Sequence, residues 1–334
     1  MKKELFCLII LSLLLASIVS KESFAAPYYE GKTITIIVGY KPGGGYDRIA
    51  RLLAKHLPRY IPGKPAVIIE NMEGAASIMA ANYLYNVAKP DGLTIGTFDR
   101  GIPFAQLTKV EGVKYDVNKF SWIGSAAVES TVLVLRNDLP YKTFDDVLRS
   151  KEPVYLGTSG QGTMESMFTH LLKEFAGLNF KMVIYPSSSD SMLAIEQKEI
   201  DGKAGSLSSF KPFMARGVVR PMVRGRVGEP GAENLPVDEN LTQNKKGKTL
   251  MAMRSAPDRI GRPYMAPPKT SPEVMYVLRD AFAKVSKDPE LLEDAKKFMF
   301  DMEYVPADEC MKVLNFVFSQ PEDIVKDFSR LIKF

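Results

Sequence analysis

Two glycine-rich turns are the parts of this chain best suited to binding chemistry. The first, Gly43 to Gly45, follows the β-branched run 33–38, and the second, Ser159 to Thr163, follows the strand-like segment 154–157. A turn that opens a helix presents backbone N–H groups without an intrahelical acceptor, and the aligned peptide dipoles add partial positive charge. Such a place binds a carboxylate or phosphate without Lys or Arg. Two facing turns would hold a small anion from both sides, although a glycine run also makes an ordinary tight turn.

Other chemistry finds little support in the residue types. Neither turn has the glycine spacing of a dinucleotide site, and the chain has no Gly-Lys-Ser/Thr of a P-loop. The two histidines, His56 and His170, fall on helix-like segments far from each other and from any cysteine cluster, so no metal site is indicated. Ser159 does not lie in a Gly-x-Ser-x-Gly elbow. The net charge of +5 over 334 residues is spread along the chain, which argues against nucleic-acid binding.

The elements that position the first turn alternate between strand and helix. Strands are expected at 33–38, 66–70 and 92–97, with helices after Gly45 and at 78–87. This βαβαβ order predicts an α/β lobe built on a parallel sheet.

A second set of elements of the same kind surrounds the second turn. Strands are expected at 131–135, 154–157 and 182–185, and helices at 144–148, 167–175 and 192–196. The stretch 225–248 is rich in Gly, Pro, Asn and Lys, which indicates an exposed crossing or loop. Three further helices are expected after it, at 272–285, at 289–298 and from residue 321.

The N-terminus has the layout of a secretory signal. Lys2 and Lys3 precede the apolar run Leu5–Val19, and the small residues Ser23 and Ala25 favour cleavage before Ala26. Fifteen apolar residues are short for a membrane span, which needs about 20; an uncleaved anchor or a buried helix is the alternative. Cleavage would remove Cys7 and leave Cys310 alone, so the exported chain would have no internal disulfide.

The order of the motifs resembles the Bug receptors, the extracytoplasmic binding proteins of tripartite tricarboxylate transporters. The opening motif is GYKPGGGYDRIAR at 39–51, followed by VIIEN at 67–71 and PDGLT at 90–94. SGQGT at 159–163 occupies the second-lobe loop, and Asp201 with SLSS at 206–209 follows. The similarity covers nearly the whole exported chain, and the motifs occur in the correct order.

The resemblance implies a two-lobed periplasmic-binding-protein fold of type II-like architecture, with mostly parallel sheets flanked by helices. Residues 1–25 would be the signal peptide, 26–127 and 236–334 the first lobe, and 128–235 the second. In the family, loop amides and hydroxyls of both lobes hold a ligand carboxylate, often through bridging waters. Carried over by position, the ligand-binding residues are Tyr40, Gly43, Gly44, Gly45, Tyr46, Asp47, Ser77, Thr97, Ser159, Gly160, Gly162, Thr163, Ser187, Ser188, Asp190 and Ser206.

Asp47, in this set, and Arg100, a further candidate ligand-binding residue, have open roles. Asp47 either contacts the ligand or only caps the helix that follows the first turn. Asp99-Arg100 places charges where the family tends to carry small polar residues. Arg100 would pair with a second carboxylate of the ligand, with Asp99, or with solvent.

The function expected from these residues is capture of a small organic anion, most simply a carboxylate, between the lobes. The expected partners are large and small membrane permease subunits, with the receptor itself a monomer without cofactors. Two other functions remain open, which are delivery of the ligand to a membrane sensor kinase and an exported α/β enzyme acting on an anionic substrate.

Overall fold

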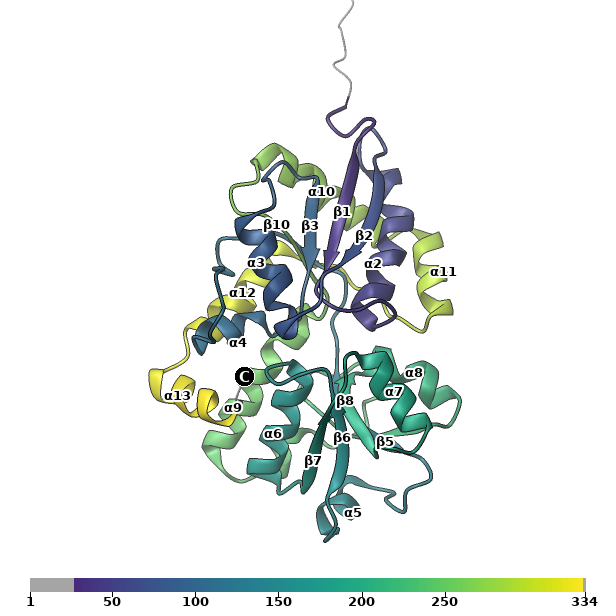
Figure 1. Ribbon diagram of the computed structural model, residues 1–334, viewed down its shortest axis with the longest axis vertical. Coiled ribbons are helices and arrows are strands. Elements are labelled where there is room, and N and C mark those ends of the chain that lie inside the picture. The colour runs from purple at the N-terminus through teal and green to yellow at the C-terminus, as the bar shows by residue number, and fades with distance from the viewer. Residues whose placement is uncertain (1–26, 333–334) are drawn as a thin grey trace, which may run out of the picture.

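The computed structural model describes residues 27–332 and shows two α/β lobes stacked along the long axis, each around its own sheet (Figure 1). The predicted signal peptide therefore lies outside the described residues. In each sheet, four strands run in one direction, with β10 and β11 reversed in the first and β5 in the second. This arrangement, mostly parallel in direction, confirms the predicted fold class. In order across the first sheet, the strands are β11 (Val305–Pro306), β4 (Ser121–Ser125), β10 (Pro263–Ala266), β3 (Thr94–Thr97), β1 (Thr33–Val38) and β2 (Ala66–Asn71). Across the second, they are β7 (Phe180–Ile184), β6 (Val154–Thr158), β8 (Gly202–Ser206), β5 (Thr131–Arg136) and β9 (Val219–Arg224).

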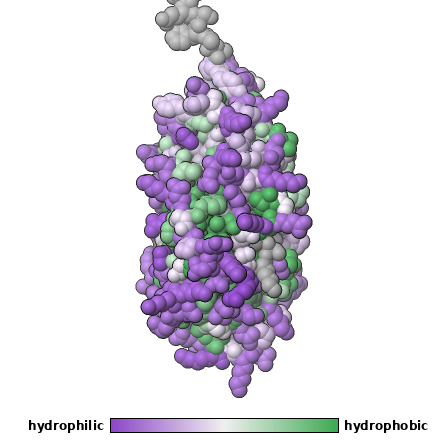
Figure 2. Space-filling model, turned by 90° about the vertical axis from the view of Figure 1, so that its left-hand side faces the viewer, coloured by the Kyte–Doolittle hydropathy of each residue, from purple (hydrophilic) through white to green (hydrophobic). Residues whose placement is uncertain are grey.

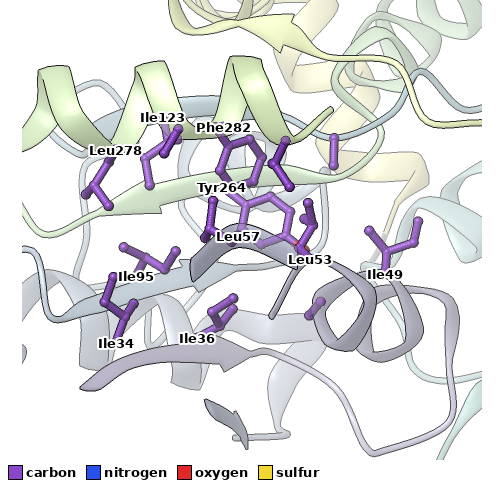
Figure 3. Close-up of a cluster of buried hydrophobic side chains, with 14 of the residues drawn as sticks. Ile34, Ile36, Ile49, Leu53, Leu57, Ile95, Ile123, Tyr264, Leu278 and Phe282 are labelled. Carbon is purple, nitrogen blue, oxygen red and sulfur yellow. The ribbon is translucent and has the colours of Figure 1, made fainter. Parts of the chain in front are cut away.

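Helices cover both faces of the first sheet. Ile34 and Ile36 of β1 pack on one face, with the helices carrying Leu53 and Phe282 (Figure 3). Ile37 packs on the opposite face, in a separate cluster. Burial of each such side chain contributes about 1.5–3 kcal/mol, which explains the continuous β-branched run seen in the sequence. The helices of this lobe are α2 (Gly45–His56), α3 (Ile78–Asn86), α4 (Ile102–Leu107), α10 (Pro272–Val285), α11 (Pro289–Lys297) and α12 (Ala307–Phe318).

The second sheet is covered in the same way. Leu133 of β5 and Leu156 of β6 pack against α6, whereas Val132 and Val134 of β5 pack in another cluster. The helices of this lobe are α5 (Phe144–Arg149), α6 (Met164–Ala176), α7 (Ser188–Glu196), α8 (Leu207–Ala215), α9 (Lys245–Ser255) and α13 (Glu322–Leu331). Short 3-10 turns lie at Leu57–Tyr60, Ala75–Ser77, Asp238–Leu241 and Ala256–Ile260.

The placement of α9 and α13 corrects the predicted lobe boundaries. The prediction put residues 236–334 in the first lobe, but Leu250 and Met251 of α9 and Phe328 of α13 pack against α6 in the second. The apolar faces of both helices find their partners there. Over residues 27–332 the chain therefore passes between the lobes three times, at residues 126–130, 256–262 and 319–321.

Two expected loops are also more ordered than predicted. The stretch 225–248 contains the turn Asp238–Leu241 and the start of α9, and Ser187 to Asp190 is the cap and first turn of α7.

The outer surface is mostly polar. Figure 2 shows hydrophilic side chains over most of one face, with hydrophobic ones between them at about mid-height. Within residues 27–332, no helix has the length and apolar character that crossing a membrane requires.

Candidate functional site

A cavity lies where the two lobes meet. The volume of this cavity is about 80 Å³. Its walls come from both lobes, and its lining residues include two tyrosines, several serines and four buried or largely buried charged side chains. The lining residues are Tyr40, Lys41, Gly44, Gly45, Tyr46, Asp99, Arg100, Ser159, Met164, Glu165, Ser187, Ser188, Gly205, Ser206, Ser209, Phe210 and Arg262.

Four helices begin at this cavity. Their N-cap residues are Gly44 for α2, Thr163 for α6, Ser187 for α7 and Ser206 for α8. The cap itself or a residue of the following turn lines the cavity in each case. The first N–H groups of each helix have no intrahelical acceptor, and each helix dipole adds partial positive charge at this end. The cavity is therefore suited to an anion.

Asp47 holds the first glycine turn in place. Its Oδ2 accepts hydrogen bonds from the Gly43 N–H at 2.8 Å and from Arg51 Nε at 2.9 Å. Asn71 donates to its Oδ1 at 3.0 Å. Burial alone would raise the pKa of Asp47, but hydrogen bonds from Arg51, Gly43 and Asn71 hold that pKa below its usual value. Asp47 is buried outside the lining of the cavity, and its bond to the Gly43 N–H fixes the turn before α2 without capping the helix itself.

Gly45 lies close to Ser209 of the second lobe and to Arg262 at the end of a chain crossing. A Cβ atom at Gly45 would lie 2.6 Å from Ser209 Oγ and 2.8 Å from Arg262 Nη2, so a side chain there would force these atoms to shift. A Cβ atom at the neighbouring Gly44 would meet nothing within 4 Å. The glycine at 45 therefore permits the lobes to close over the cavity.

The second glycine turn differs from the expectation, because a side chain of the protein uses its donors. Glu165 Oε1 accepts hydrogen bonds from both the N–H and the hydroxyl of Ser159, each at 2.7 Å. Its Oε2 lies 3.2 Å from Nζ of the buried Lys203, which also donates to Ser188 Oγ at 2.8 Å. Ser159 lines the cavity, but the two donors predicted to bind ligand are engaged with Glu165.

Arg100 pairs with a residue that its sequence position did not suggest. Its Nε lies 2.8 Å from Asp258 Oδ1, although the two residues are 158 positions apart. Its Nη1 donates to Ser206 Oγ at 3.1 Å and its Nη2 to Thr131 Oγ1 at 2.8 Å. The partners expected from sequence were a ligand carboxylate, Asp99 or solvent. Because Ser206 and Thr131 belong to the second lobe, these bonds of Arg100 join the two lobes. Arg100 is 4% exposed and also lines the cavity.

A second buried pair and two stacked tyrosines complete the wall. Arg262 Nε lies 2.9 Å from Glu129 Oε1, and its guanidinium carbon lies 4.5 Å from the centre of the Tyr46 ring. The rings of Tyr46 and Tyr40 stack with centroids 5.1 Å apart. The Tyr46 hydroxyl accepts a hydrogen bond from the Arg100 N–H at 2.9 Å. Burial, assisted by the charge of Asp99, raises the pKa of Tyr46 to about 12, so the hydroxyl keeps its proton.

The structure brings together about half of the predicted site. Those that line the cavity are Tyr40, Gly44, Gly45, Tyr46, Arg100, Ser159, Ser187, Ser188 and Ser206. Those placed outside its lining are Gly43, Asp47, Ser77, Thr97, Gly160, Gly162, Thr163 and Asp190.

Several of the residues outside the lining support it from behind. Ser77 Oγ donates to the Gly39 carbonyl and accepts from the Asp99 N–H, and Thr163 caps α6 by accepting from the Ser166 N–H. Asp190 accepts a hydrogen bond from the Ser187 hydroxyl within the first turn of α7. Thr97 is fully buried at the end of β3.

Sequence reasoning missed the lining residues Lys41, Asp99, Met164, Glu165, Gly205, Ser209, Phe210 and Arg262. Glu165, the second residue of α6, and Lys41, inside the first motif, could have been found from their positions in the sequence. Arg262 carries no local signal, because it lies between the turn Ala256–Ile260 and β10, more than 150 residues after Arg100.

Comparisons with known proteins agree with this architecture. The family model described as the tripartite tricarboxylate transporter family receptor matches residues 49–329. The UPF0065 protein in the gbd 5′ region of Cupriavidus necator is 27% identical over 285 residues, 83% of this chain and 81% of that protein. A UPF0065 protein of Bordetella pertussis is 27% identical over 289 residues, 84% of each chain.

Solved structures show the same fold. The periplasmic binding protein BugD superposes with a TM-score of 0.71 at 18% identity, over 91% of this chain and 98% of that one. A Rhodopseudomonas palustris protein solved with adipate gives a TM-score of 0.73 at 18% identity, over 90% and 98% of the two chains. MatC of the same organism, solved with malate, gives 0.69 at 18% identity, over 88% and 99%. With a family model that spans most of its length, this chain belongs to the tripartite tricarboxylate transporter receptor family of periplasmic solute-binding receptors.

Proposed function

We propose that this chain is exported to the periplasm and captures a small organic carboxylate between its lobes. It then delivers the ligand to the large and small membrane subunits of a tripartite transporter. The observation that carries the proposal is the convergence of four helix N-termini on one cavity between the lobes. Related structures solved with malate and adipate support a carboxylate as the ligand class.

Closure over the ligand is a rotation of one lobe about the three chain crossings. In the closed arrangement Gly45 meets Ser209 of the opposite lobe, beside Arg262 at the end of the second chain crossing. Bound carboxylate oxygens accept hydrogen bonds from the first-turn amides of α2 and α7 and from hydroxyls such as those of Ser188 and Ser206. Delivery requires the membrane subunits to favour the open state, which releases these contacts together.

The test is thermal unfolding of the chain from Ala26, unfolded and refolded to remove carried-over ligand. The panel contains malate, adipate, succinate, citrate, aromatic acids, amino acids and uncharged amides. A ligand at a hundredfold excess over Kd adds about 2.7 kcal/mol, which raises the unfolding temperature by several degrees. A selective rise with an acid that the protein leaves unchanged supports capture. A response confined to uncharged compounds, or conversion of the acid, would overturn the proposal.

Delivery is tested separately from capture. Vesicles that contain the two membrane subunits should accumulate the labelled acid only when this chain is added. Light scattering should give the mass of a monomer, with and without ligand. Uptake that does not depend on the added chain would leave capture intact but remove the transporter from the proposal.

A further inference from the structure

Asp99 is a buried carboxylate in the wall of the cavity. It follows β3 in the first lobe and is 5% exposed. Its Oδ2 accepts the Tyr40 hydroxyl at 2.5 Å, and its Oδ1 accepts the Gly101 N–H at 2.7 Å. Both donors are neutral, and each carboxylate oxygen has room for one further hydrogen bond.

The other buried or largely buried charges of the lining have counter-ions within the protein. Arg100 pairs with Asp258 at 2.8 Å, Arg262 with Glu129 at 2.9 Å, and Glu165 with Lys203 at 3.2 Å. Across residues 27–332, no basic side chain lies within ion-pairing distance of the Asp99 carboxylate. Among the described residues, the wall thus contains one buried carboxylate that forms no ion pair.

A buried carboxylate without a cation is costly unless its ligand provides one. Burial raises the pKa of Asp99, and the nearby charge of Arg100 opposes that rise and favours the ionised form. A ligand ammonium placed against Asp99 would favour the ionised form further and would satisfy the free positions on both oxygens.

We infer that the ligand of this receptor carries an ammonium group that binds Asp99 as well as a carboxylate that binds the helix N-termini: it is an amino acid rather than a simple di- or tricarboxylate. The inference rests on the proposed capture function and narrows its ligand class. Tyr40 orients the Asp99 carboxylate through its hydroxyl, and Met164 and Phe210 of the opposite lobe supply apolar surface for the ligand side chain.

The first experiment compares matched ligands that differ only in the amino group. Binding of L-aspartate and succinate, and of L-glutamate and glutarate, is measured by calorimetry, after a thermal-unfolding screen of all twenty amino acids and their deamino analogues. A hydrogen bond between two charged groups predicts that the responding amino acid binds at least about tenfold tighter than its deamino analogue.

The second experiment removes the charge of Asp99 while keeping its shape. In Asp99→Asn the amide oxygen can still accept the Gly101 N–H or the Tyr40 hydroxyl. The variant should lose the preference for the amino acid, so that the two members of a matched pair bind within about threefold of each other. Asp323→Asn, an exposed position on α13, makes the same change in net charge and should keep the preference. If Asp99→Asn does not fold, the comparison of each amino acid with its deamino analogue on the unaltered chain still tests whether the ligand needs an ammonium group.

The outcomes separate this inference from the function on which it rests. Equal or tighter binding of the deamino acids by the unaltered chain would overturn the ammonium site and leave carboxylate capture in place. A preference for the amino acid that survives in folded Asp99→Asn would also overturn it. No response to any acid, with or without an amino group, would overturn both.

Discussion

Gly45→Ala should weaken ligand binding without weakening the fold. The added carbon would lie 2.6 Å from Ser209 Oγ and 2.8 Å from Arg262 Nη2, where contacts between non-bonded heavy atoms are optimal at about 3.5–4.0 Å. Ser209 can rotate away, but Arg262 is 3% exposed on its side chain and held against Glu129 and the Tyr46 ring. Closure would therefore leave Ser209 and α2 roughly 1 Å farther apart, or it would cost the Arg262 guanidinium a charged hydrogen bond.

The cost of that loss sets the expected change in affinity. A hydrogen bond to a charged group contributes about 1.5–3 kcal/mol, so the ligand dissociation constant should rise roughly ten- to a hundredfold. Stability of the ligand-free protein should stay equal or rise by up to about 1 kcal/mol, since Ala is a better helix former than Gly and position 45 opens α2. The two effects have opposite signs, which separates a closure defect from misfolding.

The assay pairs calorimetry of the stabilising acid with urea unfolding of the ligand-free protein. Gly44→Ala is the matched control, because a Cβ atom there meets nothing within 4 Å and the residue already has extended backbone angles. It should bind within a few-fold of the unaltered chain. Unchanged affinity in Gly45→Ala, or an equal loss in Gly44→Ala, would refute the role of Gly45 in closure.

Three further predictions concern stability, and urea unfolding checks each of them. Arg100→Met should lower the free energy of unfolding by about 3–5 kcal/mol, because it leaves the buried carboxylate of Asp258 with one partner fewer. The control Lys55→Met removes an exposed ion pair and should lower it by under about 1 kcal/mol. Equal losses in the two variants would contradict the stabilising role of the buried pair. Thr163→Ala should cost about 1 kcal/mol through loss of the α6 cap, and a neutral result would mean that the cap contributes nothing. Burial, with the charge of Glu129, raises the pKa of Glu229 to about 7, so folded protein retains a proton that unfolded protein has released. Stability should therefore fall as the pH rises from about 4.5 to 7, and Glu229→Gln should flatten that fall; an unchanged slope would show that Glu229 is not its source.

The elements that local pattern controls were predictable from the sequence. The β-branched run of β1 and the apolar spacing of α2 gave both elements at the right place, and α10 was predicted with the bounds that the structure shows. Gly44 and Gly45 of the first turn, Ser159 of the second and Ser206 all line the cavity, because a motif of the form strand, turn and helix leaves its turn at one edge of the sheet.

What could not be predicted depends on contacts between distant residues. Arg262 and Asp258 lie in the chain crossing at 256–262, which brings them to the cavity. The sequence around them does not indicate that they lie near Arg100 and the first glycine turn. The use of the Ser159 donors by Glu165 depends on a side-chain conformation, which motif spacing does not specify. The placement of α9 and α13 failed for a related reason: an amphipathic helix shows that it has an apolar face but not which sheet that face covers.

The position of α13 affects how the two halves of the receptor can move. Two bodies joined by two neighbouring strands can both bend and twist about them. Here a third connection, at residues 319–321, leads from α12 on the first lobe to α13, which packs against α6 and α9 of the second lobe. A third attachment away from the other two removes the twisting freedom and leaves a single axis of rotation. Opening and closing would then follow one reproducible path, and the final helix would serve as a mechanical guide for a motion whose chemistry takes place elsewhere.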